Sequence, residues 1–328
     1  MDSRFTVGGF RLAALAARAV PAPATSMVAA ALGFGAGSLD RAKRQMLQRH
    51  LRRADPTLEG LALHRAAQAA YDSYARYWIE SFRLPHLSPA AVARGMDVDG
   101  YHHVTDALAA GRGVILALPH LGGWEWAGRW LVDNGLRITV VVERLEPPEL
   151  FEWFAGLRRD LGMNVVALGP DVGTEVLGAL RRNEVVCLLC DRDLQHTGVP
   201  VEFFGETTTL PAGPATLGLR TGAPVLPTAV YFTDRPDGHL GVVRPPLDAS
   251  RSGAGLRADV ARVTQALAAE LEVLIRRDPR QWHLLQPNWP SDPGYSRTPP
   301  TAPERASHQE KSGGLDSTLR GLVPKRFR

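Results

Sequence analysis

The sequence predicts an α/β fold in which a central mixed, largely parallel sheet is flanked by helices and follows a helical N-terminal region. Two features carry this prediction. Short apolar runs recur after residue 112, with helical patterns between the earlier ones, whereas residues 5–90 show helical spacing throughout. Strands that alternate with helices are joined by crossover connections, which give sheets covered by helices on both faces.

The individual elements follow from periodicity. Ala, Leu and Arg at helical spacing fill residues 5–90, and the last of these helices ends at Pro85. Apolar runs predict strands within 113–120, 137–144, 164–169, 184–191, 223–232 and 240–247. Helical patterns follow Trp124 and cover 149–161, 173–181 and 253–277, of which the last is amphipathic.

Composition divides the chain into three parts. The 328 residues are 45% hydrophobic and 22% charged, which is typical of a globular protein able to bury a sizeable core. From Ser291 onward Pro, Ser, Gly and charged residues dominate and periodicity is lost, so we expect a disordered tail. The predicted parts are a helical region over 1–90, an α/β core over 91–290 and the tail over 291–328.

The N-terminal region is basic. Residues 1–55 contain nine Lys or Arg against three Asp, although the whole chain has a net charge of only +4. Anionic lipid and nucleic acid both suit such a charge, but no nucleic-acid-binding motif occurs. The uncharged run 19–39 contains two prolines and three glycines and few large apolar residues. We therefore expect a helical segment that lies on a membrane surface, not a signal peptide or a spanning helix.

The two cysteines, Cys187 and Cys190, predict no metal site. They stand three apart in an apolar strand, so their side chains point to opposite faces. No second pair of Cys or His stands nearby to complete a zinc site, and no HExxH spacing occurs. The chain also lacks GxSxG, and neither cysteine has an evident basic partner, so covalent catalysis is not indicated.

The segment Gly113–Gly128 is the strongest indication of chemistry. An apolar strand ends at His120, Gly122 and Gly123 form a tight turn, and a helix begins with Glu125 in its first turn. Open α/β sheets place their ligand crevice at the carboxyl ends of strands. A carboxylate that accepts a hydrogen bond from one ring nitrogen leaves the other as a general base. We therefore expect Glu125 to orient His120.

At this segment the chain resembles the lysophospholipid/lipid A acyltransferase superfamily, whose signature is a His and an acidic residue separated by four positions. The resemblance extends through SYARYWIESFRLP, DRDLQHTGVPVEFFGE, LPAGPATLGLRTGAPVLPTAVY and QWHLLQPNW, and covers roughly residues 10–290. The first and last of these are most similar to phosphatidylinositol mannoside acyltransferases of actinobacteria. Those enzymes have Asp where this chain has Glu125, whereas lipid A acyltransferases commonly have Glu.

The resemblance implies direct acyl transfer. His120 would remove the proton of a sugar hydroxyl that attacks a palmitoyl-type thioester, and Glu125 would steady the imidazolium. The oxyanion would need donors, either the N–H groups of the Gly122–Gly123 turn or an arginine. The implied partners are acyl-CoA, an anionic glycolipid acceptor and the cytoplasmic face of the cell membrane, with no cofactor and no nucleic acid.

Six further residues are expected to contact substrate. Glu143 ends the second strand, Arg158 lies in the following helix, and Arg192 and Asp193 follow the strand that contains both cysteines. Each has an ordinary alternative as a surface charge or structural ion pair. Phe203 and Phe204, in the FFG block, would wall an acyl or pantetheine groove or else belong to the core.

Three functions remain open at this point. The first is the acyltransferase, acting on phosphatidylinositol mannoside, on a related glycolipid or as a late lipid A-type enzyme. The second is a hydrolase in which His120 activates water. The third is a protein that binds lipid or nucleic acid without catalysis, in which His120 would be dispensable.

Overall fold

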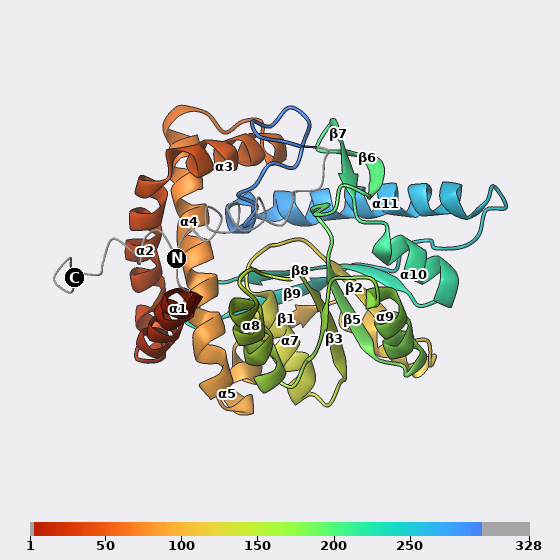
Figure 1. Ribbon diagram of the computed structural model, residues 1–328, viewed down its shortest axis with the longest axis horizontal. Coiled ribbons are helices and arrows are strands. Elements are labelled where there is room, and N and C mark those ends of the chain that lie inside the picture. The colour runs from red at the N-terminus through yellow and green to blue at the C-terminus, as the bar shows by residue number, and fades with distance from the viewer. Residues whose placement is uncertain (1–2, 297–328) are drawn as a thin grey trace.

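The computed structural model describes residues 3–296, with side chains from residue 8 onward. The predicted α/β class is confirmed. Helices surround a seven-stranded sheet and a separate two-stranded hairpin (Figure 1). Residues 297–328, which make up most of the predicted disordered tail, lie outside the described residues, and the domain bounds at 90 and 290 stay predictions.

The sheet has the order β1-β9-β8-β2-β5-β3-β4. All neighbouring strands are parallel except the antiparallel pair β8 and β9. Its strands are β1 (Met96–Asp99), β2 (Val114–Leu118), β3 (Ile138–Val142), β4 (Asn164–Ala167), β5 (Val185–Leu189), β8 (Val225–Phe232) and β9 (His239–Val243). The six predicted strands are therefore present, and β1 is an addition. The hairpin of β6 (Val199–Phe203) and β7 (Glu206–Leu210) was also not predicted.

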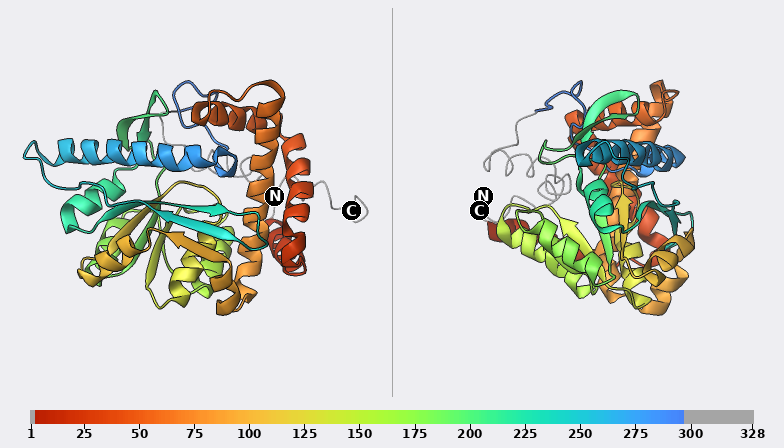
Figure 2. Two further views of the ribbon diagram at one scale, coloured as in Figure 1. Left: turned by 180° about the vertical axis from the view of Figure 1, so that it is seen from behind. Right: turned by 90° about the vertical axis from the view of Figure 1, so that its right-hand side faces the viewer.

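Five helices precede or begin the core: α1 (Ser3–Arg18), α2 (Thr25–Leu39), α3 (Arg41–Ala54), α4 (Gly60–Arg83) and α5 (Pro89–Arg94). The helix α4 stands at one end of the sheet, with α2 along its outer side (Figures 1 and 2). The remaining helices are α6 (His102–Ala109), α7 (Trp124–Asp133), α8 (Pro148–Asp160), α9 (Val172–Arg181), α10 (Gly213–Thr221) and α11 (Leu256–Arg277).

The two faces of the sheet bury separate cores because side chains alternate along a strand. On β2, Ile115 and Ala117 pack with residues of α9 and α11. Val114, Leu116 and Leu118 pack on the opposite face with residues of α5, α6 and α7. All five residues are buried, as expected for a central parallel strand.

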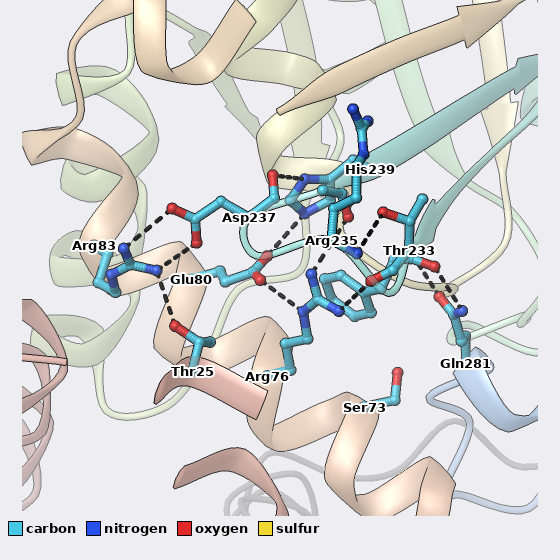
Figure 3. A network of polar contacts seen from close by, with 12 residues as sticks. Thr25, Ser73, Arg76, Glu80, Arg83, Thr233, Arg235, Asp237, His239 and Gln281 are labelled. Atoms are coloured by element: carbon cyan, nitrogen blue, oxygen red, sulfur yellow. Dashed lines mark hydrogen bonds and ion pairs between the residues drawn. The ribbon is translucent and has the colours of Figure 1, made fainter. Parts of the chain in front are cut away.

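A buried polar network joins the N-terminal helices to β9 and to the turn between β8 and β9 (Figure 3). Glu80, on α4, accepts a hydrogen bond from Nε2 of His239 on β9 at 2.8 Å. Arg83 pairs with Asp237, in the β8–β9 turn, at 2.7 Å and also donates to Thr25 at the start of α2. Paired charges are tolerated in such positions because each satisfies the other. The network fixes α2 and α4 relative to the sheet.

Candidate active site

His120 lies just beyond the carboxyl end of β2, where the sequence predicted it. The glycine turn that follows is required by space and by backbone geometry. Gly122 has a φ of +62°, and a Cβ atom there would lie 1.9 Å from the carbonyl oxygen of Val230. Only glycine adopts this conformation at so close an approach. The turn lets α7 begin immediately and leaves the imidazole partly exposed.

A buried carboxylate, Asp191, holds the ring of His120. Oδ1 of Asp191 lies 2.6 Å from Nδ1 of His120, and Oδ2 accepts the backbone N–H of His120 at 3.0 Å. Oδ2 also accepts the indole N–H of Trp282 at 2.7 Å. The side chain of Asp191 is fully buried. An ionised carboxylate only accepts, so the proton lies on Nδ1 and the Nε2 lone pair is left free.

The hydrogen bonds keep Asp191 charged despite its burial. Burial by itself would raise its pKa. The charge and side-chain bond of His120, the Trp282 N–H and the His120 backbone N–H outweigh burial and lower the pKa of Asp191. The carboxylate can therefore stabilise a positive charge on His120 as that ring takes up a proton.

The predicted pairing of His120 with Glu125 is corrected by the structure. Glu125 lies in the first turn of α7 as expected, but its Oε1 accepts hydrogen bonds from Arg158 of α8 and from the Tyr77 hydroxyl at 3.2 Å. Its carboxylate therefore orients a guanidinium, whereas the carboxylate beside His120 belongs to Asp191.

Arg158 and Tyr77 have opposite electrostatic roles around Glu125. Burial disfavours the charge on Arg158, but Glu125 and Tyr77 together raise the pKa of Arg158, so the guanidinium is charged. Burial and then the adjacent Glu125 carboxylate raise the pKa of Tyr77 well above its usual value. The Glu125 carboxylate thus lies between a charged guanidinium and a neutral phenol.

Two cavities meet beside this cluster. A groove of about 630 Å³ is bordered by His120 and Arg158 and reaches past α9 and α10. A second, almost entirely apolar cavity of about 90 Å³ lies between the sheet and helices α6 and α7 and is bordered by Arg158 and Glu125. Six residues line both: Trp124, Val141, Val142, Arg158, Leu188 and Leu189. The apolar cavity therefore adjoins the groove where Arg158 stands.

Two of the other predicted residues border the groove as a pair. Arg192 donates to Glu143 at 3.2 Å, and both line the groove with His120. Nε of Arg192 is buried without a hydrogen-bond partner. These residues present polar atoms to anything that occupies the groove.

Asp193 also borders the groove, but its oxygens serve the following loop. They accept the backbone N–H groups of Gln195 and Gly198 and the hydroxyl of Thr209. These contacts favour a structural role for this carboxylate.

Phe203 and Phe204 do not wall either of these two cavities. Both are buried in the core, where Phe203 stacks on Trp289 and Phe204 packs against Trp282. The hairpin of β6 and β7 directs these rings toward the core, away from the groove.

The glycine turn does not supply free N–H groups. Gly122 donates to the carbonyl of Gln281 at 2.9 Å, and Gly123 donates to that of Val230 at 3.1 Å. The sequence suggested two kinds of donor to the oxyanion, the glycine N–H groups and an arginine. Because both glycine N–H groups are already bonded, an arginine is the candidate that remains.

The cysteines and the metal-binding side chains give no sign of other chemistry. Burial raises the pKa of Cys187 to about 12 and that of Cys190 well above its usual value, so both stay as unreactive thiols. Within the described residues, His, Cys, Asp and Glu side chains form no group of three that could hold a metal ion.

Sequence reasoning missed three residues around His120: Asp191, Trp282 and His283. His283 lines the groove, and its backbone N–H donates to the carbonyl of His120 at 2.7 Å. The register of the sheet indicates Asp191: Leu118 of β2 lies opposite Leu189 of β5, and His120 and Asp191 each follow two positions later, so they lie side by side. Using it requires knowing that these two strands are neighbours.

Comparison with known proteins identifies the family of this chain. Residues 8–291 match the family described as bacterial lipid A biosynthesis acyltransferase. The chain belongs to this family. It is 47% identical over 234 residues to the phosphatidylinositol mannoside acyltransferase of Mycobacterium tuberculosis, covering 70% of this chain and 72% of that protein. It is 42% identical over 265 residues to the Mycolicibacterium smegmatis protein of the same name, covering 79% and 84%.

The predicted resemblance and the predicted enzyme class are thus confirmed, and the chain is an acyltransferase of the phosphatidylinositol mannoside and lipid A type. An acyltransferase needs a base for the acceptor hydroxyl, a donor for the oxyanion and room for an acyl chain. In this member of the family, His120, Arg158 and the apolar cavity are the features that could meet these needs.

Proposed function

We propose that this acyltransferase moves a palmitoyl-type acyl group from acyl-CoA to a sugar hydroxyl of phosphatidylinositol mannoside or a related glycolipid, with His120 as general base. The observation that carries this proposal is the His120–Asp191 pair at the wall of the groove. It leaves Nε2 as the nitrogen able to accept a proton.

The reaction forms one ester bond and breaks one thioester bond. His120 takes the proton from the attacking hydroxyl as its oxygen bonds to the thioester carbonyl carbon. Collapse of the tetrahedral intermediate expels the CoA sulfur, and the proton passes from His120 to that sulfur. Asp191 stays ionised throughout and balances the transient imidazolium.

Arg158 is proposed as the donor to the oxyanion. Its guanidinium borders both cavities, which is the position a thioester carbonyl would occupy if its chain entered the apolar cavity. Glu125 fixes Arg158 in place and, being mostly buried, does so away from solvent. A preorganised donor of this kind contributes about 100- to 1000-fold to rate.

The apolar cavity is proposed to receive the part of the acyl chain next to the carbonyl, since about 90 Å³ is too small for a whole palmitoyl chain. Its lining is almost wholly aliphatic or aromatic, which suits methylene groups at about 0.8 kcal/mol for each one buried. The wider groove would take the CoA portion and the acceptor headgroup, where Glu143 and Arg192 offer hydrogen bonds to sugar hydroxyls. No cofactor is needed for this chemistry.

The acceptor requires contact with a membrane, and α1 and α2 offer a surface for it. Leu12 on α1 and Met27 and Phe34 on α2 are among the most exposed large apolar side chains of the described residues. One helical stretch, Ala22–Leu39, is long and apolar enough by composition to cross a membrane, with 22% of it buried.

We propose instead that α1 and α2 lie on the cytoplasmic face of the cell membrane. One side of α2 packs so closely on α4 that a Cβ atom on Gly33 would lie within 2.3 Å of Asp72. The other side of α2 exposes Met27 and Phe34, so that a helix held to the protein along one side presents apolar side chains that can enter the membrane interface. The Lys and Arg residues of the first 55 positions would attract anionic lipid, each contributing about 1 kcal/mol where it lies near the membrane surface.

The test is to incubate the purified protein with palmitoyl-CoA and phosphatidylinositol mannosides and to follow thiol release and lipid mass. Wild type should produce acylated lipid, and His120→Ala should not. His102→Ala, an exposed histidine on α6, is the matched control and should behave as wild type. Thiol release without acylated lipid would indicate the alternative hydrolase, and preference for a lipid A precursor would reassign the acceptor. Full activity of His120→Ala would remove the base from the mechanism.

A further inference from the structure

The segment Gln281–His283 pairs with the residues that carry the candidate base. Gly122 donates to the carbonyl of Gln281, and His283 donates to the carbonyl of His120. Leu121 and Trp282 form an antiparallel bridge between these two bonds. The segment therefore fixes the backbone on both sides of Leu121.

The side chain of Trp282 adds a contact that this backbone pairing does not need. Its indole N–H reaches Oδ2 of Asp191 at 2.7 Å, although 91 residues separate them in the chain. Trp282 is 1% exposed, and its ring packs against Phe204 and His50. Because the ring is enclosed on these sides, the direction of its N–H is fixed.

We propose that Trp282 is a positioning residue that holds the Asp191 carboxylate in line with Nδ1 of His120. This inference rests on the proposed role of His120 as general base. The indole acts through Asp191 and touches neither substrate in the proposed mechanism.

The physical reason is that a buried carboxylate needs fixed donors in place of water. Oδ2 of Asp191 receives two N–H groups, one from the His120 backbone and one from Trp282, while Oδ1 is left to the imidazole. The Trp282 bond also contributes to the lowered pKa of Asp191. Without it, Oδ2 keeps one N–H donor in place of two. The orientation of the carboxylate is then less tightly fixed, and less of its negative charge is neutralised, so that more of the charge acts on the imidazole at Oδ1.

The other titratable groups that face this pair stay neutral across the useful pH range. Burial lowers the pKa of His283 to about 3, with a further contribution from the charge of His120. Burial also lowers the pKa of His50, which contacts the indole, to about 4. Burial raises the pKa of Cys190, next to Asp191, well above its usual value. A change in the acidic limb of the pH profile would therefore report on the His120–Asp191 pair.

Trp289 provides a matched control. It is equally buried, and its indole N–H donates to a backbone carbonyl, that of Phe203, at 3.1 Å. Trp282→Phe and Trp289→Phe each remove one indole N–H bond and a similar volume from neighbouring positions in the core. Only Trp282→Phe removes a donor from Asp191.

The experiment measures kcat, both KM values and the pH profile of the full-length wild type and the two variants, with thermal midpoints for folding. We expect Trp282→Phe to lower kcat by about 10- to 100-fold, the rate equivalent of one hydrogen bond to a charged group. Both KM values should stay within about twofold, since substrate binding is untouched. The acidic limb of kcat/KM should move to higher pH, because more carboxylate charge then faces the imidazole.

Trp289→Phe should lower the thermal midpoint to a similar extent but leave the acidic limb in place and kcat within about threefold of wild type. The inference is overturned if Trp282→Phe leaves the limb unmoved or moves it to lower pH, or if Trp289→Phe reproduces the effect. Such results would leave the proposed function standing as long as His120→Ala is inactive. An active His120→Ala would instead remove the proposed function on which the inference depends.

Discussion

The substitution Asp191→Asn tests most directly which carboxylate serves His120. In the wild type, Oδ2 accepts N–H groups from the His120 backbone and from Trp282, and Oδ1 accepts the imidazole N–H. An asparagine has the same shape but only one oxygen. That oxygen will face the two donors at the Oδ2 position, which places the amide NH2 group opposite Nδ1.

The amide then donates to Nδ1 across the 2.6 Å contact, and the imidazole proton moves to Nε2. Nε2 can no longer accept a proton from the acceptor hydroxyl. An asparagine that imposes the wrong histidine tautomer lowers kcat by about 10⁴-fold, equivalent to about 5.5 kcal/mol in the barrier. We expect this loss with little change in either KM.

Glu125→Gln is the informative comparison, since Glu125 holds Arg158 and makes no contact with His120. Its expected loss is about 10- to 100-fold, the equivalent of one charge-assisted hydrogen bond. Acylated lipid is measured by mass at saturating palmitoyl-CoA, and the thermal midpoint of each variant shows whether it is folded. The assignment of Asp191 would be refuted if folded Asp191→Asn kept more than about a tenth of wild-type kcat while Glu125→Gln fell further.

Three further predictions concern other parts of the molecule. Gly241→Val would place methyl groups in the apolar cavity, where a Cβ atom on residue 241 would lie 2.8 Å from the side chain of Met96. In competition assays between acyl-CoA donors of different length, the variant should prefer a donor shorter than palmitoyl-CoA. An unchanged preference for chain length would argue against an acyl chain in this cavity. Burial lowers the pKa of His50 to about 4 in the folded protein, whereas the unfolded chain binds this proton near pH 6.5, so the free energy of unfolding decreases as the pH drops below 6.5. In denaturant titrations between pH 7.5 and 4.5, the free energy of unfolding of His50→Gln should decrease by about 2.5 kcal/mol less than that of the wild type. Equal decreases in the two proteins would contradict this prediction. Met27→Asp with Phe34→Asp should reduce sedimentation with anionic vesicles at least tenfold while activity on detergent-dispersed lipid persists, and unchanged vesicle binding would exclude the exposed face of α2 as the contact.

Local patterns in the sequence determined the fold class and the position of the histidine. Apolar runs predicted the six strands because the pattern of side chains that identifies a strand lies within a few neighbouring residues. The glycine pair after His120 predicted a turn that the positive φ of Gly122 confirms. The family resemblance then identified the enzyme class, as the matches to known acyltransferases bear out.

Only the tertiary structure decided which residues surround that histidine. Glu125 is five positions from His120 yet bonds to Arg158, because the first turn of α7 directs it toward α8. Asp191 is 71 positions away yet lies at 2.6 Å, because β2 and β5 are adjacent and in register. Strand order depends on how the whole chain packs, so no spacing within a single motif contains it. For the same reason Phe203 is in the core and Trp282 is beside Asp191: each position depends on contacts between distant segments, which side-chain periodicity does not record.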